Sequence, residues 1–178
     1  MEFKSVDIDA PELSDEVKSA LVPENDVENM VLTIGSVLRG DDAAGPLLAK
    51  MIEESAIDTW RVVKGDLTPE DEIGYIRLIH PKNLLVVDAA DMKLEPGSIR
   101  RVTKNDVAEQ FFITTHSMPI SFLLSELESA CDNLIFVGIQ PATTEFYGSM
   151  TGDVRSAVED IFNKLVADSD LSCYPALT

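Results

Sequence analysis

The stretch VLTIGSVLRGDDAAGPLLAKM, residues 31–51, passes from an apolar strand through a turn with two glycines into a helix. The run MVLTIG, 30–35, is apolar enough to predict a buried strand. The helix after it is amphipathic, with apolar residues on one face and charged residues on the other. The apolar face holds Leu47, Leu48, Met51 and Ile52, and the charged face holds Lys50, Glu53 and Glu54. This pattern predicts a first strand and helix pair, with the adjacent acids Asp41 and Asp42 in its turn.

The same alternation of strands and helices continues along the chain. Thr68 is the expected N-cap of one helix, with Pro69 at its first position. No crossover helix is expected directly after residue 103, so the strand before it can be antiparallel. The alternation predicts a three-layer α/β/α sandwich around a mostly parallel sheet. The further strands are expected over 59–65, 83–89 and 133–141, and 95–103 is expected to form a turn followed by a strand. The helices are expected over 68–79, 119–130 and 152–169.

Length and charge narrow the function classes. The 178 residues, 45% of them apolar, are enough for one well-buried core. We therefore expect one domain over 30–178, preceded by an extension over 1–29 that is partly helical and packs on the domain. The 14 basic and 32 acidic residues give a net charge of −18, which makes duplex nucleic acid or an anionic membrane surface a poor partner. A bound cation or simple solubility accounts better for the charge.

The cysteines and the hydropathy indicate a cytoplasmic protein. Cys131 and Cys173 form no CxxC motif and lack metal-type spacing. The first residues are acidic and contain no apolar signal-peptide core. No run approaches the ~18 apolar residues that span a bilayer.

Three polar features follow strands at the edge of the predicted sheet where ligands bind in open α/β proteins. Asp41 and Asp42 follow the first strand, Asp88 ends the third, and His116 lies in the loop TTHSMP before a helix. Asp88 is notable because ionising a carboxylate at the end of the run LLVV costs free energy unless a cation or N–H donors compensate. Two carboxylates and an imidazole suit a borderline divalent ion such as zinc or nickel.

Structural roles compete with this metal-site hypothesis. Capping of the following helix would explain one of the paired acids, and loop amides could satisfy Asp88. Asp91 is more typical of a turn residue, and His80 of a helix end. The turn GSVLRG lacks the GxGxxG spacing, and its acids would repel a pyrophosphate, so a dinucleotide site is disfavoured.

Four blocks of the sequence, in order, resemble the hydrogenase maturation endopeptidases, most closely the branch acting on the hydrogenase-3 type. These proteases trim the C-terminal tail from nickel-iron hydrogenase large-subunit precursors. The resemblance covers residues 30 to about 165. The blocks are IGSVLRGDDAAGPLLA (34–49), LLVVDAADM with LEPGSIR (84–100), TTHSMPISFLLSEL (114–127) and FVGIQPATTEFYGSMT (136–151).

The resemblance implies a five-stranded sheet with one antiparallel strand, and a nickel-interacting trio of Asp42, Asp88 and His116. The nickel belongs to the substrate, the large-subunit precursor, and marks it as ready for cleavage. Another divalent ion such as zinc or cadmium could bind in vitro. Asp41 is then expected to cap its helix or to support Asp42. Where the family commonly has Asn and Gly, this chain has Ser36 and Ala43, and we expect Ala43 to be helical.

Two other functions remain open from the sequence. In a receiver domain, acids equivalent to Asp41, Asp42 and Asp88 would bind magnesium and accept a phosphoryl group. A receiver also needs a lysine after its last strand, and FVGIQP offers none. A chaperone that grips the large subunit without cleaving it would use the same residues as the protease. In the protease, the loop after Gly65 is expected to line the peptide groove.

Overall fold

One five-stranded sheet organises the computed structural model, which describes residues 27–109 and 119–177. The strand order is β2-β1-β3-β5-β4. Four strands are parallel, and β4 runs antiparallel to β5 at one edge. The strands are β1 (Asn29–Ile34), β2 (Trp60–Asp66), β3 (Asn83–Ala89), β4 (Ile99–Arg101) and β5 (Asn133–Ile139). The predicted fold class, a mostly parallel five-stranded sheet with one antiparallel strand, is confirmed.

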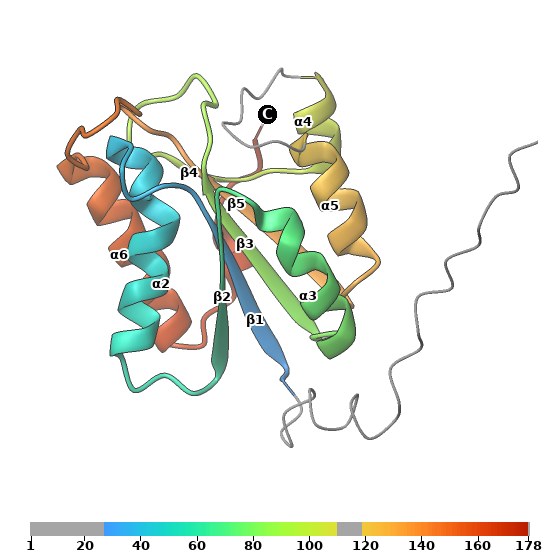
Figure 1. The fold of residues 1–178 in the computed structure, drawn as a ribbon. Coiled ribbons are helices and arrows are strands. Elements are labelled where there is room, and N and C mark those ends of the chain that lie inside the picture. The colour runs from blue at the N-terminus through green and yellow to red at the C-terminus, as the bar shows by residue number, and fades with distance from the viewer. Residues whose placement is uncertain (1–26, 110–118, 178) are drawn as a thin grey trace, which may run out of the picture.

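Helices cover both faces of the sheet, as Figure 1 shows. On one face lie α2 (Ala44–Glu54) and α6 (Gly152–Val166), and on the other α3 (Ile73–Ile79), α4 (Lys104–Glu109) and α5 (Ile120–Glu128). Three short 3-10 helices complete the described structure: η1 (Gly40–Ala43), η2 (Pro69–Glu72) and η3 (Leu171–Cys173). Among the described residues, no helix has the length and apolarity needed to cross a bilayer.

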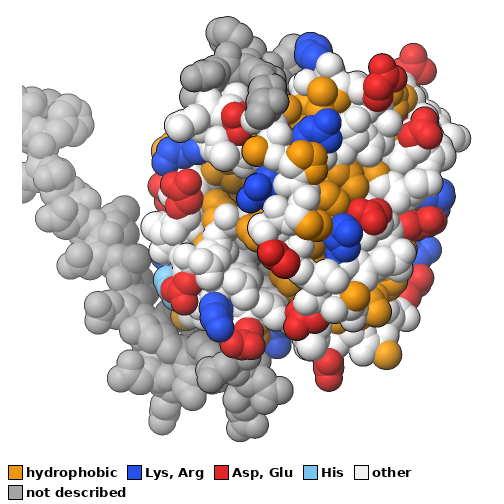
Figure 2. Space-filling view, turned by 180° about the vertical axis from the view of Figure 1, so that it is seen from behind, with side chains coloured by type: hydrophobic (Ala, Val, Ile, Leu, Met, Phe, Trp, Pro, Cys, Tyr) orange, Lys and Arg blue, Asp and Glu red, His pale blue; other side chains and the backbone are white. Residues whose placement is uncertain are grey.

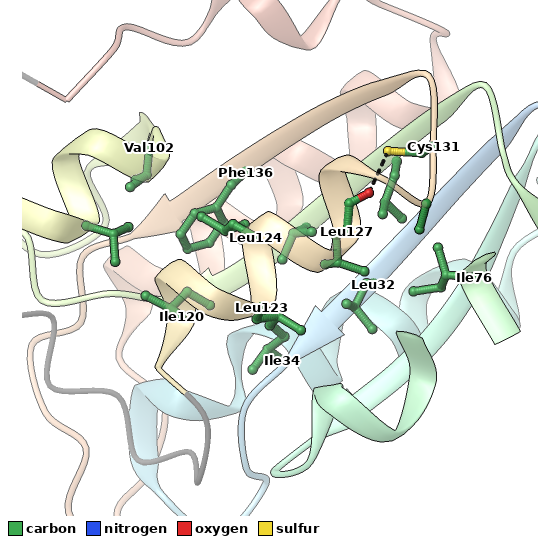
Figure 3. Close-up of a cluster of buried hydrophobic side chains, with 14 of the residues drawn as sticks. Leu32, Ile34, Ile76, Val102, Ile120, Leu123, Leu124, Leu127, Cys131 and Phe136 are labelled. Atoms are coloured by element: carbon green, nitrogen blue, oxygen red, sulfur yellow. Dashed lines mark hydrogen bonds between the residues drawn. The ribbon is translucent and has the colours of Figure 1, made fainter. Parts of the chain in front are cut away.

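Each face of the sheet has its own hydrophobic core. Alternate residues of a strand point to opposite faces, so β3 contributes Leu84 and Val86 to one core and Leu85 and Val87 to the other. The first core is closed by α5, whose Leu123 and Leu127 are fully buried (Figure 3). These four strand residues are almost inaccessible to solvent, which is why the sequence there reads as continuously apolar.

The structure differs from the expectation at two helical segments. The helix predicted over 68–79 begins as η2 and becomes α-helical only from Ile73. Thr68 occupies the expected N-cap position of η2, but its side chain makes no capping hydrogen bond. The chain after β4 forms α4, a six-residue helix, where we expected none. A helix this short shows too little apolar periodicity to be predicted. The proposed helical extension over 1–29 lies almost wholly outside the described residues and stays a prediction.

The end of the chain covers the antiparallel edge strand. Arg101 donates its backbone N–H to Pro175 O at 2.9 Å and accepts from Leu177 N at 2.8 Å. Its Nε donates to Tyr174 O at 2.7 Å. These bonds occupy an edge that would otherwise be open to another chain. Elsewhere the charged side chains are dispersed: Figure 2 shows Asp and Glu scattered over the face opposite that of Figure 1, with Lys and Arg among them.

Candidate functional site at the carboxyl edge of the sheet

The predicted site lies where the order of the strands reverses. From β1 the chain crosses through α2 to β2 on one side, then through α3 to β3 on the other. The carboxyl ends of β1 and β3 therefore flank the switch point, the usual ligand crevice of an open α/β sheet. There η1, which carries Asp41 and Asp42, contacts β3, the strand that carries Asp88.

The turn between β1 and η1 is tightly built. Gly35 has a φ of 133°, and a Cβ added to it would lie 2.0 Å from the carbonyl oxygen of Asp42. That oxygen accepts a hydrogen bond from Ser36 N at 3.1 Å, and the Ser36 hydroxyl accepts one from Leu38 N at 3.3 Å. Ala43 ends η1 with a φ of −74°, so the expected helical conformation at this position is confirmed. The turn requires glycine and fixes the position of both acids.

Asp41 is fully buried and binds the loop between β5 and α6. Its Oδ2 accepts hydrogen bonds from Ala142 N at 2.8 Å and Thr143 N at 3.2 Å. Its Oδ1 accepts from Thr151 N at 2.7 Å and from the Thr151 hydroxyl at 3.0 Å. The expectation that Asp41 caps its own helix is wrong, because neither η1 nor α2 has a side-chain cap. Asp41 instead ties two loops together at the N-terminus of α6.

Asp42 and Asp88 are also buried, with 4% and 2% of their surfaces exposed. Asp42 lines a groove of about 440 Å³ together with Arg39, Asp91, Thr143 and Thr144. No residue of the loop after Gly65 lines this groove. The expectation that this loop lines the peptide groove stays a prediction. Asp88 alternates with Leu84 and Val86 along β3, which places it on the face that α5 covers.

His116 lies outside the described residues, so the structure does not test the trio with Asp42 and Asp88. The chain re-enters the described part just before Ile120, which packs in the same core as Leu84 and Val86. The start of α5 is thus on the face of the sheet that Asp88 shares. Within the described residues alone, no group of three or more His, Cys, Asp or Glu side chains could hold a metal ion.

Gln140 is a positioning residue that we did not predict. Its Oε1 accepts hydrogen bonds from Met92 N at 2.7 Å and Leu94 N at 3.2 Å, and its Nε2 donates to Asp91 Oδ1 at 3.2 Å. It therefore holds the loop after β3 against the end of β5. In the sequence Gln140 is a single amide residue between an apolar strand and Pro141, and this pattern is too common to identify a functional residue.

The remaining polar candidates have structural roles. Asp91 accepts the N–H of Lys93 at 3.2 Å as an Asx turn, and the hydrogen bond from the Lys93 ammonium lowers the pKa of Asp91. His80 is the C-cap of α3, and its Nε2 lies 3.2 Å from Asp132 Oδ1. Both structural interpretations of these residues are confirmed.

Neither cysteine is suited to act as the nucleophile. Burial raises the pKa of Cys131 to about 11, so its thiol stays protonated at neutral pH. The Cys131 thiol donates to Leu127 O at 3.3 Å inside the core (Figure 3). Cys173 is exposed in the C-terminal tail, and neither cysteine lines the groove at Asp42.

Comparison with known proteins shows the class to which this α/β/α fold belongs. The family model described as HycI, hydrogenase maturation protease, matches residues 46–168. The hydrogenase 3 maturation protease of Escherichia coli K12 is 42% identical over 137 residues, covering 77% of this chain and 88% of that protein.

Two solved structures show the same fold. The crystal structure of a hydrogenase 3 maturation protease superposes with a TM-score of 0.80 at 39% identity, covering 85% of this chain and 97% of that one. A [NiFe] hydrogenase maturation protease from Thermococcus kodakarensis superposes with a TM-score of 0.69 at 21% identity, covering 86% and 97%. The chain belongs to the hydrogenase maturation protease family, and it is a hydrolase of peptide bonds.

Proposed function

We propose that the protein is an endopeptidase that removes the C-terminal extension from the nickel-loaded precursor of a nickel-iron hydrogenase large subunit. In this proposal Asp42, Asp88 and His116 recognise the nickel, which the substrate carries. The relatives' names support a hydrogenase precursor as the substrate class. Both cysteines are free, as is usual in reducing compartments, so we place the reaction in the cytoplasm.

The observation that carries the proposal is the burial of two carboxylates, Asp42 and Asp88, on contacting elements at the switch point. Removing an ionised carboxylate from water costs free energy that a nearby cation can offset. Carboxylate oxygens and an imidazole nitrogen form a ligand set that suits a borderline divalent ion. A nickel ion that arrives with the substrate would therefore bind here and position the precursor's tail.

Substrate-borne nickel could also assist hydrolysis, since a divalent ion polarises a carbonyl or lowers the pKa of a bound water. The chain's own contribution is to hold the carboxylates in place. Asp42 is fixed by the Gly35 turn, and Asp88 by its register opposite Gly138 of β5. Asp41 keeps the neighbouring loop in position through its bonds to Thr143 and Thr151.

The rival functions have less support. A receiver-type sheet has the strand order 2-1-3-4-5, whereas here the antiparallel β4 lies outside β5. The chain after β5 continues with Gln140 and Pro141, and no lysine takes the receiver position. A chaperone that does not cleave would share the site, but family membership favours proteolysis.

Substitutions in the trio test the proposal. We expect Asp42→Asn, Asp88→Asn and His116→Ala each to reduce trimming of a nickel-loaded precursor by at least about 10- to 100-fold, the loss typical even for residues that only support metal ligands. Asp58→Asn is the control, because Asp58 is exposed at the opposite edge of the sheet. Trimming is followed by gel mobility, and circular dichroism confirms that each variant is folded. Wild-type rates in all three variants would refute the site assignment.

A further inference from the structure

Four large apolar side chains are exposed on the two segments that supply Arg39 and Thr144 to the groove at Asp42. Val37 and Leu38 lie in the turn after β1, and Phe146 and Tyr147 lie in the loop after β5. Tyr147 N donates to Leu38 O at 2.7 Å, which joins the two segments. We call these four residues the apolar rim. Exposed apolar residues that gather in this way mark interaction surfaces, whereas single ones are common on any protein.

Tyr147 adopts a backbone conformation that is unfavourable for its residue type. Gly148 N donates to Glu145 O at 3.0 Å, which closes a four-residue turn with Tyr147 at its third position. The φ of Tyr147 is 59°, a value that favours Gly or Asn at this place in a turn. The side chain is 79% exposed, so burial of the ring does not compensate for the strain. Such strain is typical of functional positions.

The two aromatic rings contact each other and lie near a guanidinium group. Phe146 and Tyr147 meet edge to face, with ring centroids 4.7 Å apart and planes at 80°. The guanidinium carbon of Arg39 lies 6.0 Å from the centroid of Phe146. The two rings therefore form one continuous apolar surface within the apolar rim.

Arg39 connects the apolar rim to the groove, because it contacts Phe146 and lines the groove with Asp42. Its Nε is buried and makes no hydrogen bond with any residue that the structure describes. No carboxylate in the described part of the chain forms an ion pair with it. A guanidinium so placed can donate to an acceptor that a ligand brings.

We propose that the apolar rim and Arg39 bind an extended apolar segment of the substrate protein and lead it toward Asp42. An apolar side chain of that segment packs on Phe146 and Tyr147, while one of its main-chain carbonyls accepts from the Arg39 guanidinium. A neutral carbonyl fits better than a carboxylate, because Asp42 and Asp91 line the same groove. This inference rests on the proposed function, since it takes the precursor as the ligand.

The test compares rim variants with matched controls on the nickel-loaded precursor. Tyr147→Asn removes the ring but suits the left-handed backbone, so its melting temperature should stay close to that of the wild type. Arg39→Met removes the donor. The controls are Phe122→Ala on α5 and Arg77→Met on α3, which lie on a helix-covered face away from the rim.

We expect each rim variant to raise both KM and the Kd for immobilised precursor about tenfold, which corresponds to 1.4 kcal/mol, with kcat within about twofold of wild type. The controls should leave all three constants within about twofold of wild type. Rim variants that behave like the controls, or that lose only kcat, would overturn the inference. The inference would also be overturned if the wild type were a dimer and Tyr147→Asn were a monomer, because a second copy of the chain would then occupy the rim.

The binding measurement separates this inference from the proposed function. If the wild type binds the precursor but does not cleave it, the proposed function fails, and weaker binding by the rim variants still supports the rim. If the wild type cleaves it and the rim variants match the controls, only the rim assignment fails. Absence of wild-type binding would overturn both.

Discussion

Two adjacent acids of the same residue type have different roles in this protein. Asp41 accepts hydrogen bonds from Ala142, Thr143 and Thr151, so its carboxylate is used inside the fold. Asp42, one residue on, lines the groove. The difference follows from η1, whose tight turn points neighbouring side chains in different directions. We infer that Asp41 determines where the β5–α6 loop lies and that Asp42 faces the substrate.

Removing the charge of Asp41 should destabilise the fold. In Asp41→Asn the amide nitrogen would face backbone N–H donors, and charge-assisted hydrogen bonds would be lost, so we expect the free energy of unfolding to fall by roughly 2–3 kcal/mol. Urea unfolding followed by circular dichroism measures this change. The control Asp58→Asn should stay within about 0.5 kcal/mol of wild type, as exposed substitutions do. An Asp41→Asn protein as stable as the wild type would contradict the role assigned to this carboxylate.

At the scale of single residues, the sequence predicted where the acidic side chains lie, but it did not predict which groups they contact. Asp41, Asp42 and Asp88 could be predicted to lie at the ligand edge, because each follows or ends an apolar strand. The partners of Asp41 could not, because they are three backbone N–H groups and one threonine hydroxyl that lie about a hundred positions away along the chain. Tyr147 could not either, since its importance lies in a backbone angle.

Among the secondary-structure elements, α2 depends on a close approach to β1. A Cβ on Gly45 would lie 2.1 Å from Ile34 O, so the first turn of α2 fits against the strand only without a side chain. This approach also sets the position of η1 and its acids, because η1 leads directly into α2. The strands predicted over 83–89 and 133–141 follow from apolar runs, and the second ends at Ile139 in the structure. The η2–α3 break and α4 were not predictable, because short helical segments carry little periodicity.

Two glycine substitutions with opposite expected effects test this packing. Gly45→Ala should lower the free energy of unfolding by about 1–3 kcal/mol, because α2 must move away from β1. Gly74→Ala should raise it by about 0.5–1 kcal/mol, because alanine favours the helix and its Cβ would meet nothing within 4 Å. Chemical denaturation measures both. Equal effects of the two substitutions would show that the approach of α2 to β1 is not constrained.

At the scale of the whole molecule, the two cores on opposite faces of the sheet hold β1 and β3 side by side, so that the buried acids Asp42 and Asp88 lie at the switch point. The fold class could be predicted from the alternation of strands and helices, because right-handed crossovers leave few arrangements for this order. The position of His116 relative to Asp42 and Asp88 could not be predicted by the same reasoning. It depends on residues 110–118, which the structure does not describe.

The most direct test of the account is the intact mass of a candidate large-subunit precursor before and after incubation with the protein. The precursor is prepared with and without nickel, and both forms are measured. We predict that only the nickel-loaded form loses mass, by the amount of a single C-terminal peptide. An unchanged mass in the nickel-loaded form would contradict the proposed protease function, and equal loss from the nickel-free form would contradict recognition of nickel by the site.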